Sequence, residues 1–326
     1  MGQMGQESGT GDDIAVRNMT VTFETSHGPV SAVRDVNTTF RTGEVTGMIG
    51  ESGSGKSVLG MAMLQLLASN ARIDGVCMYR GRNLTALPAK EMEKIRGKEI
   101  GLIPQNPAES LNPVMRIKKQ LIESVTVHDP KGEKRAEERY SDLMKRMGFS
   151  DPEQTGSQYS FQLSGGMNQR VISVLGMMNR PRWVIADEPT KGLDAILRRQ
   201  VYQVLREITE QDTKNMILIT HDVELARKLC RKILVLYRGE ILEQGRTEDV
   251  LGHPKHPYTK GLMDSLPKNG MKPIPQPVKE REGAAGGCIF YPRCPYGTGR
   301  CGTEHPGEFS AGDRWRVRCF LYESES

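Results

Sequence analysis

The chain has 326 residues, of which 37% are hydrophobic and 26% are charged, a composition typical of a soluble globular protein. Its 45 basic and 40 acidic residues are interspersed and form no aromatic-studded basic stripe, so the net charge of +5 does not indicate nucleic-acid binding. No run reaches the roughly 18 apolar residues of a membrane span, and residues 1–13 contain no apolar segment of a secretory signal. We therefore expect a flexible leader over 1–13 and a cytoplasmic protein that associates with membranes only through partners.

The first predicted elements are β-strands. Apolar residues alternate along 14–45 and are interrupted by turn signals at 26–29 and 41–43, which predicts an antiparallel β layer. An apolar strand over 44–49 then leads directly into a glycine-rich loop, and a helix over 56–67 is predicted to follow. Strand, loop and helix are thus expected in immediate succession.

The rest of the core alternates between helices and strands. A strand over 99–103 precedes a charged segment, about 107–165, that we expect to form a helical subdomain. The further predicted elements are helix 166–178, strand 183–186, helix 197–210 and strands 216–219, 232–237 and 240–243. Alternation with short connections predicts an α/β fold with a mostly parallel sheet covered on both faces.

The composition changes after residue 266. Residues 267–287 are rich in Pro, Gly, Lys and Glu, which is typical of a linker, and residues 288–326 form a cysteine-containing tail. We therefore expect one main domain over 14–266, followed by the linker and the tail.

The glycine-rich loop fits the phosphate-binding pattern G-x-x-x-x-G-K-S. It consists of Gly50, Glu51, Ser52, Gly53, Ser54, Gly55, Lys56 and Ser57. Its glycines allow backbone N–H groups to turn toward a β-phosphate, Lys56 is expected to reach the β- and γ-phosphates of ATP, and the Ser57 hydroxyl is expected to bind Mg²⁺. The alternative is a glycine-rich turn with a chance lysine, and the flanking strand and helix argue against it.

The strand over 183–186 ends in two acids, Asp187 and Glu188. A carboxylate pair at the end of a buried strand is costly unless a cation lies there. We therefore expect Asp187 to hold Mg²⁺ through water and Glu188 to act as the general base that polarises the attacking water. A solvated strand end is the alternative, and the phosphate loop elsewhere in the chain argues against it.

The segment Leu163-Ser-Gly-Gly-Met-Asn-Gln-Arg170 lies between the helical segment and the acid-tipped strand. It resembles the signature of ABC ATPases, and all motifs of that family occur in the expected order between residue 14 and about residue 266. The resemblance implies the ABC nucleotide-binding fold, which has a RecA-like parallel core sheet, an antiparallel β subdomain and a helical subdomain; here we expect a small Cys-rich C-terminal extension as well.

The resemblance also implies roles for individual residues. Phe23 matches the aromatic position that stacks on adenine, and Gln105 the Q-loop residue that senses Mg²⁺ and the attacking water. Asp194 matches the D-loop aspartate, and His221 the switch histidine that bridges the γ-phosphate and the opposing D-loop. The family forms head-to-tail dimers, in which four signature residues act on the partner's ATP. Here these are Ser164, Gly165, Gly166 and Met167.

Finer features resemble the importer subfamily for peptides, nickel or opines. They are the loop itself, the segment Gln105-Asn-Pro-Ala-Glu-Ser-Leu-Asn-Pro113 and His256-Pro-Tyr-Thr259. The resemblance implies a second ATPase subunit, usually a non-identical paralogue, two transmembrane permease subunits, an extracytoplasmic solute-binding protein, and a place on the cytoplasmic face of the membrane. The chain departs from the pattern at Asn168, Pro104 and Lys191-Gly192. The last two departures border the dimer and permease contacts and leave the partner and the cargo open.

Four of the six cysteines lie in the tail, at Cys288, Cys294, Cys301 and Cys319. Their spacing lacks the C-x2-C pairs of common zinc sites, and it resembles the Gly-Cys-x-Phe-x-x-Arg-Cys motif with which some importer subunits hold a [4Fe-4S] cluster. Zinc, and unligated or disulfide-bonded thiols, remain alternatives. Cys77 and Cys230 are interpreted as ordinary, partly buried thiols.

Two other functions fit parts of this pattern. A non-transport ABC ATPase acting on a macromolecular assembly usually carries two nucleotide-binding cores or a long coiled coil, and this chain shows neither. A metal-binding regulator with an inactive ATPase core is disfavoured because Lys56, Asp187, Glu188 and His221 are all present. We therefore expect an ATP-hydrolysing motor subunit of a membrane importer.

Overall fold

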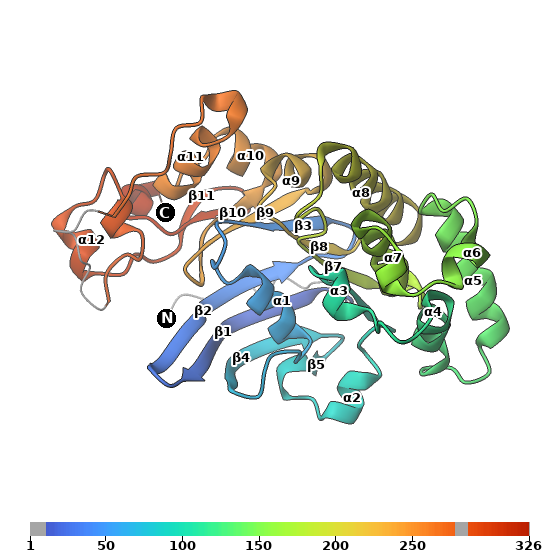
Figure 1. Cartoon of the computed structure of the whole chain (residues 1–326). Helices are drawn as coiled ribbons and strands as arrows, with labels where there is room; N and C mark the ends of the chain where they lie inside the picture. Colours follow the sequence, from blue (N-terminus) through green and yellow to red (C-terminus); the bar gives the residue numbers. More distant parts are fainter. Residues whose placement is uncertain (1–10, 278–285, 326) are drawn as a thin grey trace.

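The computed structural model describes residues 11–277 and 286–325 and contains two β-sheets (Figure 1). One is antiparallel with strand order β2-β1-β4-β5, and the other has the order β11-β12-β10-β9-β3-β8-β7-β6. The strands are β1 (Ile14–Thr25), β2 (Gly28–Phe40), β3 (Val45–Ile49), β4 (Ala71–Tyr79), β5 (Arg82–Asn83), β6 (Ile100–Ile103), β7 (Trp183–Asp187), β8 (Met216–Ile219), β9 (Lys232–Tyr237), β10 (Glu240–Arg246), β11 (Phe309–Gly312) and β12 (Trp315–Val317).

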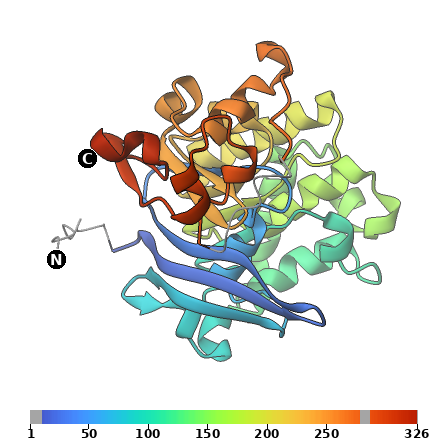
Figure 2. The ribbon, with the colours of Figure 1, turned by 90° about the vertical axis from the view of Figure 1, so that its left-hand side faces the viewer.

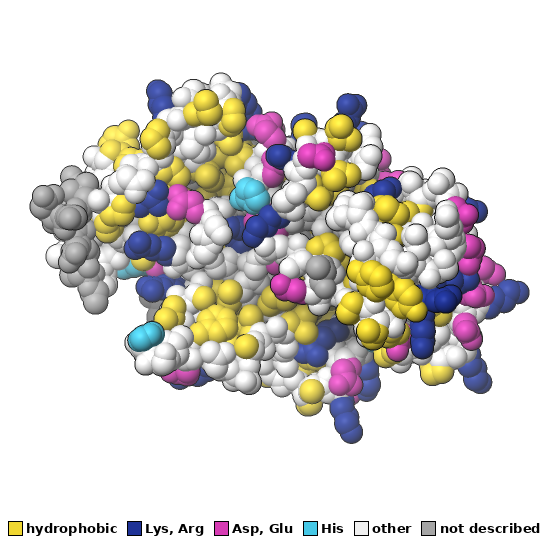
Figure 3. Space-filling model, viewed as in Figure 1, with side chains coloured by type: hydrophobic (Ala, Val, Ile, Leu, Met, Phe, Trp, Pro, Cys, Tyr) yellow, Lys and Arg dark blue, Asp and Glu magenta, His cyan; other side chains and the backbone are white. Residues whose placement is uncertain are grey.

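Helices surround the large sheet and form a lobe at one end of it, on the right in Figure 1. The helices are α1 (Lys56–Met63), α2 (Ala89–Glu93), α3 (Pro107–Ser110), α4 (Ile117–Thr126), α5 (Glu133–Arg146), α6 (Pro152–Gly156), α7 (Gly165–Met177), α8 (Ala195–Glu207), α9 (Val223–Leu229), α10 (Thr247–Gly252), α11 (Pro257–Asp264) and α12 (Gly299–Thr303). On the face seen in Figure 3, Lys and Arg are mixed with Asp and Glu over this lobe.

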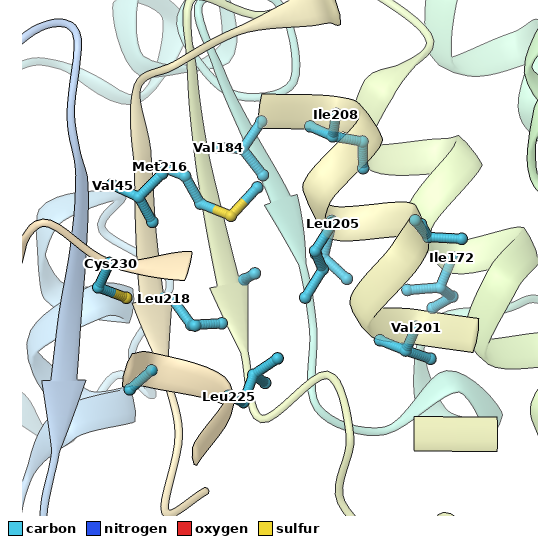
Figure 4. Close-up of a cluster of buried hydrophobic side chains, with 14 of the residues drawn as sticks. Val45, Ile172, Val184, Val201, Leu205, Ile208, Met216, Leu218, Leu225 and Cys230 are labelled. Carbon is cyan, nitrogen blue, oxygen red and sulfur yellow. The ribbon is translucent and has the colours of Figure 1, made fainter. Parts of the chain in front are cut away.

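The parallel part of the large sheet runs β9-β3-β8-β7-β6. Strands β3 and β7 are buried at every residue, which is why they consist of apolar runs rather than of alternating residues. Helices α7 and α8 cover one face, where Ile172 and Leu205 lie beside Val184 and Met216 (Figure 4). The parallel strands and the helices packed on them form one layer, which holds the ends of the strands in position.

The antiparallel sheet packs on the other side of the core. Ile14, Val16, Met19 and Val21 alternate along β1, are fully buried, and share a cluster with Leu59 of α1. The predicted alternation of this region is therefore confirmed. Strand β4 was not predicted, because Asp74 and Gly75 interrupt its apolar pattern.

Several predicted element boundaries were wrong. The helix expected over 56–67 ends at Met63, because Gln65 adopts φ +50° and its side-chain amide donates to the carbonyl oxygens of Leu84 (2.6 Å) and Leu87 (2.9 Å). Helix α8 begins two residues earlier than expected, since Asp194 caps it. No helix in the described part of the chain is long and apolar enough to cross a bilayer.

The leader is partly held in place, contrary to the expectation for 1–13. Asp12 pairs with Arg80 at 2.6 Å and with Arg182 at 2.5 Å, and its carbonyl accepts a hydrogen bond from the Trp183 indole at 2.8 Å. Residues 1–10 lie outside the described residues. Only the described end of the leader is thus known to pack on the core.

The cysteine-containing tail joins the core sheet rather than standing apart. Strand β12 pairs antiparallel with β10, and the Trp315 indole donates to the fully buried carboxylate of Glu243 at 2.9 Å. Viewed from the side of the tail, the chain end covers this edge of the sheet (Figure 2). Of the expected linker, residues 278–285 lie outside the described residues. The tail therefore uses the core of the main domain instead of forming its own.

Candidate functional site

The phosphate-binding loop joins β3 to α1, as the sequence predicts. Gly50 has φ +150°, and a Cβ there would lie 2.1 Å from the carbonyl oxygen of Leu236. Gly55 has φ +97°, and a Cβ there would lie 2.4 Å from the carbonyl oxygen of Ala32. Real Cβ atoms cannot approach backbone so closely, so both positions require glycine. The tight loop is therefore built against β2 and β9.

Lys56 lies across the loop. Its ammonium group donates to the carbonyl oxygens of Gly50 and Glu51, both at 2.9 Å, and to the Ser54 hydroxyl at 3.2 Å. The residue is only 5% exposed. Burial lowers the pKa of Lys56, while the nearby carboxylates of Glu188, Asp187 and Glu51 oppose that shift. A desolvated cation held by hydrogen bonds is ready to exchange them for phosphate oxygens.

Asp187 connects the loop to the end of β7. The Ser57 hydroxyl donates to its carboxylate at 2.8 Å, although 130 residues separate the two in sequence. Asp187 is 2% exposed, and burial raises the pKa of its carboxyl group despite the Ser57 hydrogen bond. A hydroxyl and a buried carboxylate side by side are the oxygen ligands that Mg²⁺ prefers. The residues present therefore fit the ion expected here.

Glu188 follows in a conformation that is unusual for its residue type. Its φ is +47°, and its amide donates to the Ile219 carbonyl at 2.8 Å, so the chain leaves β7 in a sharp turn. The Glu188 carboxylate is hydrogen-bonded to Nδ1 of His221 at 2.7 Å. The Glu188 side chain is 10% exposed and that of His221 is 56% exposed. The structure thus brings together the two residues that were expected to act on the attacking water and the γ-phosphate.

Two other predicted residues border this arrangement. Gln105 follows β6, which pairs in parallel with β7, so it lies at the same edge of the sheet as Asp187. Phe23 pairs with Val30 at the end of the β1–β2 hairpin and is partly buried. The same hairpin contributes the Ala32 carbonyl that abuts Gly55.

The signature segment caps a different element. Ser164 is the N-cap of α7, and its hydroxyl accepts a hydrogen bond from the Met167 amide at 3.2 Å. A Cβ at Gly166 would lie 2.7 Å from a methyl carbon of Leu197, whereas one at Gly165 would meet no described atom within 4 Å. Asp194 caps α8 by accepting from the Ile196 and Leu197 amides, both at 2.9 Å. Ser164 and Gly165 are exposed.

Two residues that the sequence analysis did not assign converge on the loop. The Glu51 amide donates to the Tyr258 hydroxyl at 2.9 Å. Both oxygens of the Glu51 carboxylate accept from the guanidinium of Arg293, at 3.0 and 3.2 Å. Both residues lie in motifs noted above, His256-Pro-Tyr-Thr259 and the Cys288–Cys294 segment, but only the folded chain shows that they contact the loop.

The four tail cysteines line one cavity of about 210 Å³ together with Phe290 and His256. Burial raises the pKa of both Cys288 and Cys319 to about 11. Among the described residues, no three His, Cys, Asp or Glu side chains are placed to hold a single metal ion. Cys77 and Cys230 are fully buried rather than partly buried, at 0% and 6% exposure, and lie away from this cavity.

Comparisons with known proteins agree with this arrangement. Residues 33–191 match the ABC transporter family, and residues 242–301 match the C-terminal region of oligopeptide/dipeptide transporters. The oligopeptide transport ATP-binding protein OppD of Salmonella typhimurium is 36% identical over 94% of this chain and 93% of its own length. The dipeptide transport ATP-binding protein DppD of Escherichia coli is 34% identical over 94% and 95%, respectively.

Solved structures show the same fold in the ATPase domain. The dimeric, post-hydrolysis structure of the ATP-binding cassette MJ0796 with ADP and phosphate has a TM-score of 0.64 and 26% identity, covering 72% of this chain and 98% of that one. CbiO1 of Clostridium perfringens has a TM-score of 0.60 over 74% and 90%, at 24% identity. The chain therefore belongs to the ABC transporter ATP-binding subunits, within the group marked by the oligopeptide/dipeptide transporter C-terminal region, and is the ATP-hydrolysing subunit of a membrane importer.

Proposed function

We propose that this chain drives the import of oligopeptides, dipeptides or a related small solute such as a nickel chelate. The observation that carries the proposal is the tail: residues 242–301 match a region named for oligopeptide and dipeptide transporters, and this region contacts the ATP loop. The names of the relatives, which refer to oligopeptide and dipeptide transport, support the same substrate class.

We assign each step of ATP binding and hydrolysis to particular residues of the site. The loop residues 50–57 bind the phosphates of ATP, with Lys56 on the β- and γ-phosphates and Phe23 stacking on adenine. Ser57, Asp187 and Gln105 hold Mg²⁺, which when bound neutralises charge on the phosphates. Glu188 accepts a proton from the attacking water. His221, 2.7 Å from Glu188, orients that carboxylate and contacts the γ-phosphate.

The second half of the site comes from another subunit. Ser164, Gly165, Gly166 and Met167 lie at the N-terminus of α7, where the helix dipole favours an anion. We assign them to the γ-phosphate held by a second ABC ATPase subunit, a non-identical paralogue, with Asp194 at the same interface. Two permease subunits and an extracytoplasmic solute-binding protein complete the importer, and the chain lies peripherally on the cytoplasmic face of the membrane.

Replacement of the general base tests the assignment. In the assembled complex, Glu188→Gln is expected to lower ATP turnover by about a thousandfold while ATP binding is retained, because general-base catalysis contributes on the order of 10²–10⁴. Glu224→Gln, at a half-exposed glutamate of α9 that pairs with Lys268, is the matched control and is expected to leave turnover unchanged. Unchanged ATP turnover in Glu188→Gln would show that Glu188 is not the general base.

Purification of the complex tests the importer itself. Mass spectrometry of the detergent-solubilised assembly is expected to show two polytopic subunits and a second ATPase, with a peptide or metal chelate on the solute-binding protein. Association with a soluble assembly and no polytopic partner would favour the non-transport alternative.

We further assign Cys288, Cys294, Cys301 and Cys319 to a [4Fe-4S] cluster. The support for this assignment is that all four thiols line one cavity of about 210 Å³, since four cysteines are the usual ligands of such clusters. Among the described residues they are not placed around a single ion, so binding a cluster would require the thiols to move closer together. Metal binding would displace the protons that burial favours on Cys288 and Cys319. Anaerobic metal analysis and EPR of the intact chain are expected to show iron and sulfide; a single zinc per chain would replace the assignment by the zinc alternative.

A further inference from the structure

Glu51 places a negative charge in the middle of a loop that binds a polyanion. An unpaired carboxylate there would repel the phosphates of ATP, because like charges close together in a partly buried site are weakly screened. The carboxylate is instead paired with Arg293 through two hydrogen bonds, at 3.0 and 3.2 Å. Bidentate pairing of this kind both neutralises the charge and fixes its direction.

Every polar group of Glu51 has a partner. Its carboxylate is held by Arg293, its amide donates to the Tyr258 hydroxyl at 2.9 Å, and its carbonyl accepts from Lys56 at 2.9 Å. Lys56 is expected to leave the carbonyl when it turns to the phosphates of ATP. The contacts from Tyr258 and Arg293 then remain to hold the loop in shape.

Arg293 is itself fixed in position. Its Nε donates to the Pro275 carbonyl at 2.8 Å, and the guanidinium lies 5.7 Å from the ring centre of Tyr237 and 6.0 Å from that of Phe290. Its side chain is 13% exposed, against 38% for Glu51. Exposed ion pairs contribute little, but a bidentate pair with a largely buried, stacked arginine keeps its geometry.

The aromatic residues around Arg293 connect the tail to the core. Phe290 is 1% exposed and packs against both Tyr237 of β9, at 5.3 Å between ring centres, and Tyr258 of α11, at 5.5 Å. Arg293 immediately precedes Cys294 of the cysteine cavity. The position of the guanidinium therefore depends on the folded tail, 242 residues away from Glu51 in sequence.

We propose that Arg293 is a positioning residue of the ATP site, through which the cysteine-containing tail holds the phosphate-binding loop at Glu51 and sets its affinity for ATP. The proposal concerns nucleotide affinity and not the chemical step, because Arg293 contacts a loop side chain and none of the predicted catalytic groups. It does not depend on whether the tail holds a metal.

A double-mutant cycle in the intact, purified importer tests this proposal. Arg293→Gln is expected to raise KM for ATP about tenfold, equivalent to ~1.4 kcal/mol, with kcat changed less than twofold. Arg293→Lys keeps the charge but not the bidentate geometry, so its KM for ATP is expected to lie between that of the wild type and that of Arg293→Gln. Arg316→Gln, a tail arginine on β12, is the matched control and is expected to match the wild type.

Measuring Arg293→Gln in both the wild-type chain and a Glu51→Gln chain decides whether Arg293 acts through Glu51. In a Glu51→Gln chain, Arg293→Gln is expected to change KM by less than twofold, because the carboxylate that it would release is gone. An equal rise of KM in both backgrounds, a fall of kcat at unchanged KM, or no effect of Arg293→Gln would each overturn the proposal. None of these outcomes would affect the assignment of the chain as an ATPase, which depends on Glu188 and Lys56.

Discussion

The two glycine-rich segments of this ATPase differ in what surrounds them. In the phosphate-binding loop, a Cβ at Gly50 or Gly55 would lie 2.1 or 2.4 Å from backbone oxygen atoms of the same chain. In the signature, a Cβ at Gly165 would meet no described atom within 4 Å. The fold thus requires glycine at Gly50 and Gly55, whereas the described chain leaves space for a side chain at Gly165, as it does at Gly53 of the loop. In the dimer proposed above, this open space beside Gly165 would face the ATP of the second subunit.

The largest expected effect is at the loop. Gly50→Ala is expected to cost about 4 kcal/mol of folding free energy, because overpacking against the Leu236 carbonyl adds to a backbone conformation that favours glycine. Nucleotide binding is expected to be lost with it. Thermal unfolding and ATP titration of Gly53→Ala, in open space at φ +77°, give the comparison in the same loop, where about 1 kcal/mol is expected. Equal effects at both positions would contradict the steric explanation.

The attachment of helix α5 to the core gives the next effect. Asp212 accepts from Arg139 at 2.8 Å and from Arg146 at 2.7 Å, and joins α5 to the end of α8. Asp212→Asn is expected to cost about 3 kcal/mol, because two largely buried arginines lose the carboxylate that they share, and Arg146 keeps only Glu207 at 2.8 Å as a close partner. Urea unfolding measures this; Asp142→Asn, whose carboxylate is 55% exposed, is expected to cost less than about 1 kcal/mol.

The same residue gives a pH dependence with a defined sign. Burial opposes ionisation of Asp212, but the hydrogen bonds from Arg146 and Arg139 outweigh it and lower its pKa below the usual value of 3.8. The contribution is therefore present above that value and lost as the pH falls below it. Between pH 5 and pH 3, we expect the wild type to lose more stability than Asp212→Asn. Parallel curves would exclude this ion pair as a source of acid sensitivity.

The exposed signature glycine gives a functional effect without a structural one. Gly165→Asp is expected to leave the stability of the isolated chain within about 1 kcal/mol, since an acid at a helix N-terminus is tolerated. In the assembled complex, the new carboxylate would face the partner's γ-phosphate, and turnover is expected to fall about a hundredfold. If ATP affinity of the isolated chain fell by the same factor, the residue would act within its own subunit.

The smallest expected effect concerns the second support of Glu51. Tyr258→Phe removes the acceptor of the Glu51 amide in a fully buried place, so about 1 kcal/mol of stability is expected to be lost. ATP affinity is expected to weaken severalfold, as measured by titration of the assembled complex. Tyr202→Phe on α8 is the control, and equal losses in both variants would show that the Tyr258 hydroxyl has no special role at the loop.

Much of the fold was predictable because its signals are local. Strand, loop and helix around 44–63 are consecutive, so the apolar strand, the glycines and Lys56 together predict one strand–loop–helix unit. The buried strands 183–187 and 216–219 were found for the same reason, since apolar runs between short connections have few other structures available. Strand β4 was missed because Asp74 and Gly75 interrupt its apolar pattern, and the true end of α1 was missed because the Gln65 side chain donates to distant carbonyl groups.

By itself, the sequence determined that this chain is an ABC ATPase, because the phosphate-binding loop, the signature and the acid-tipped strand are each encoded in a few adjacent residues. The tertiary structure alone decided how the tail is used. The pairing of β12 with β10, and the convergence of Tyr258 and Arg293 on Glu51, join residues up to 242 positions apart. Such contacts depend on the order and register of strands in the sheet, and neither periodicity nor motif spacing carries that information.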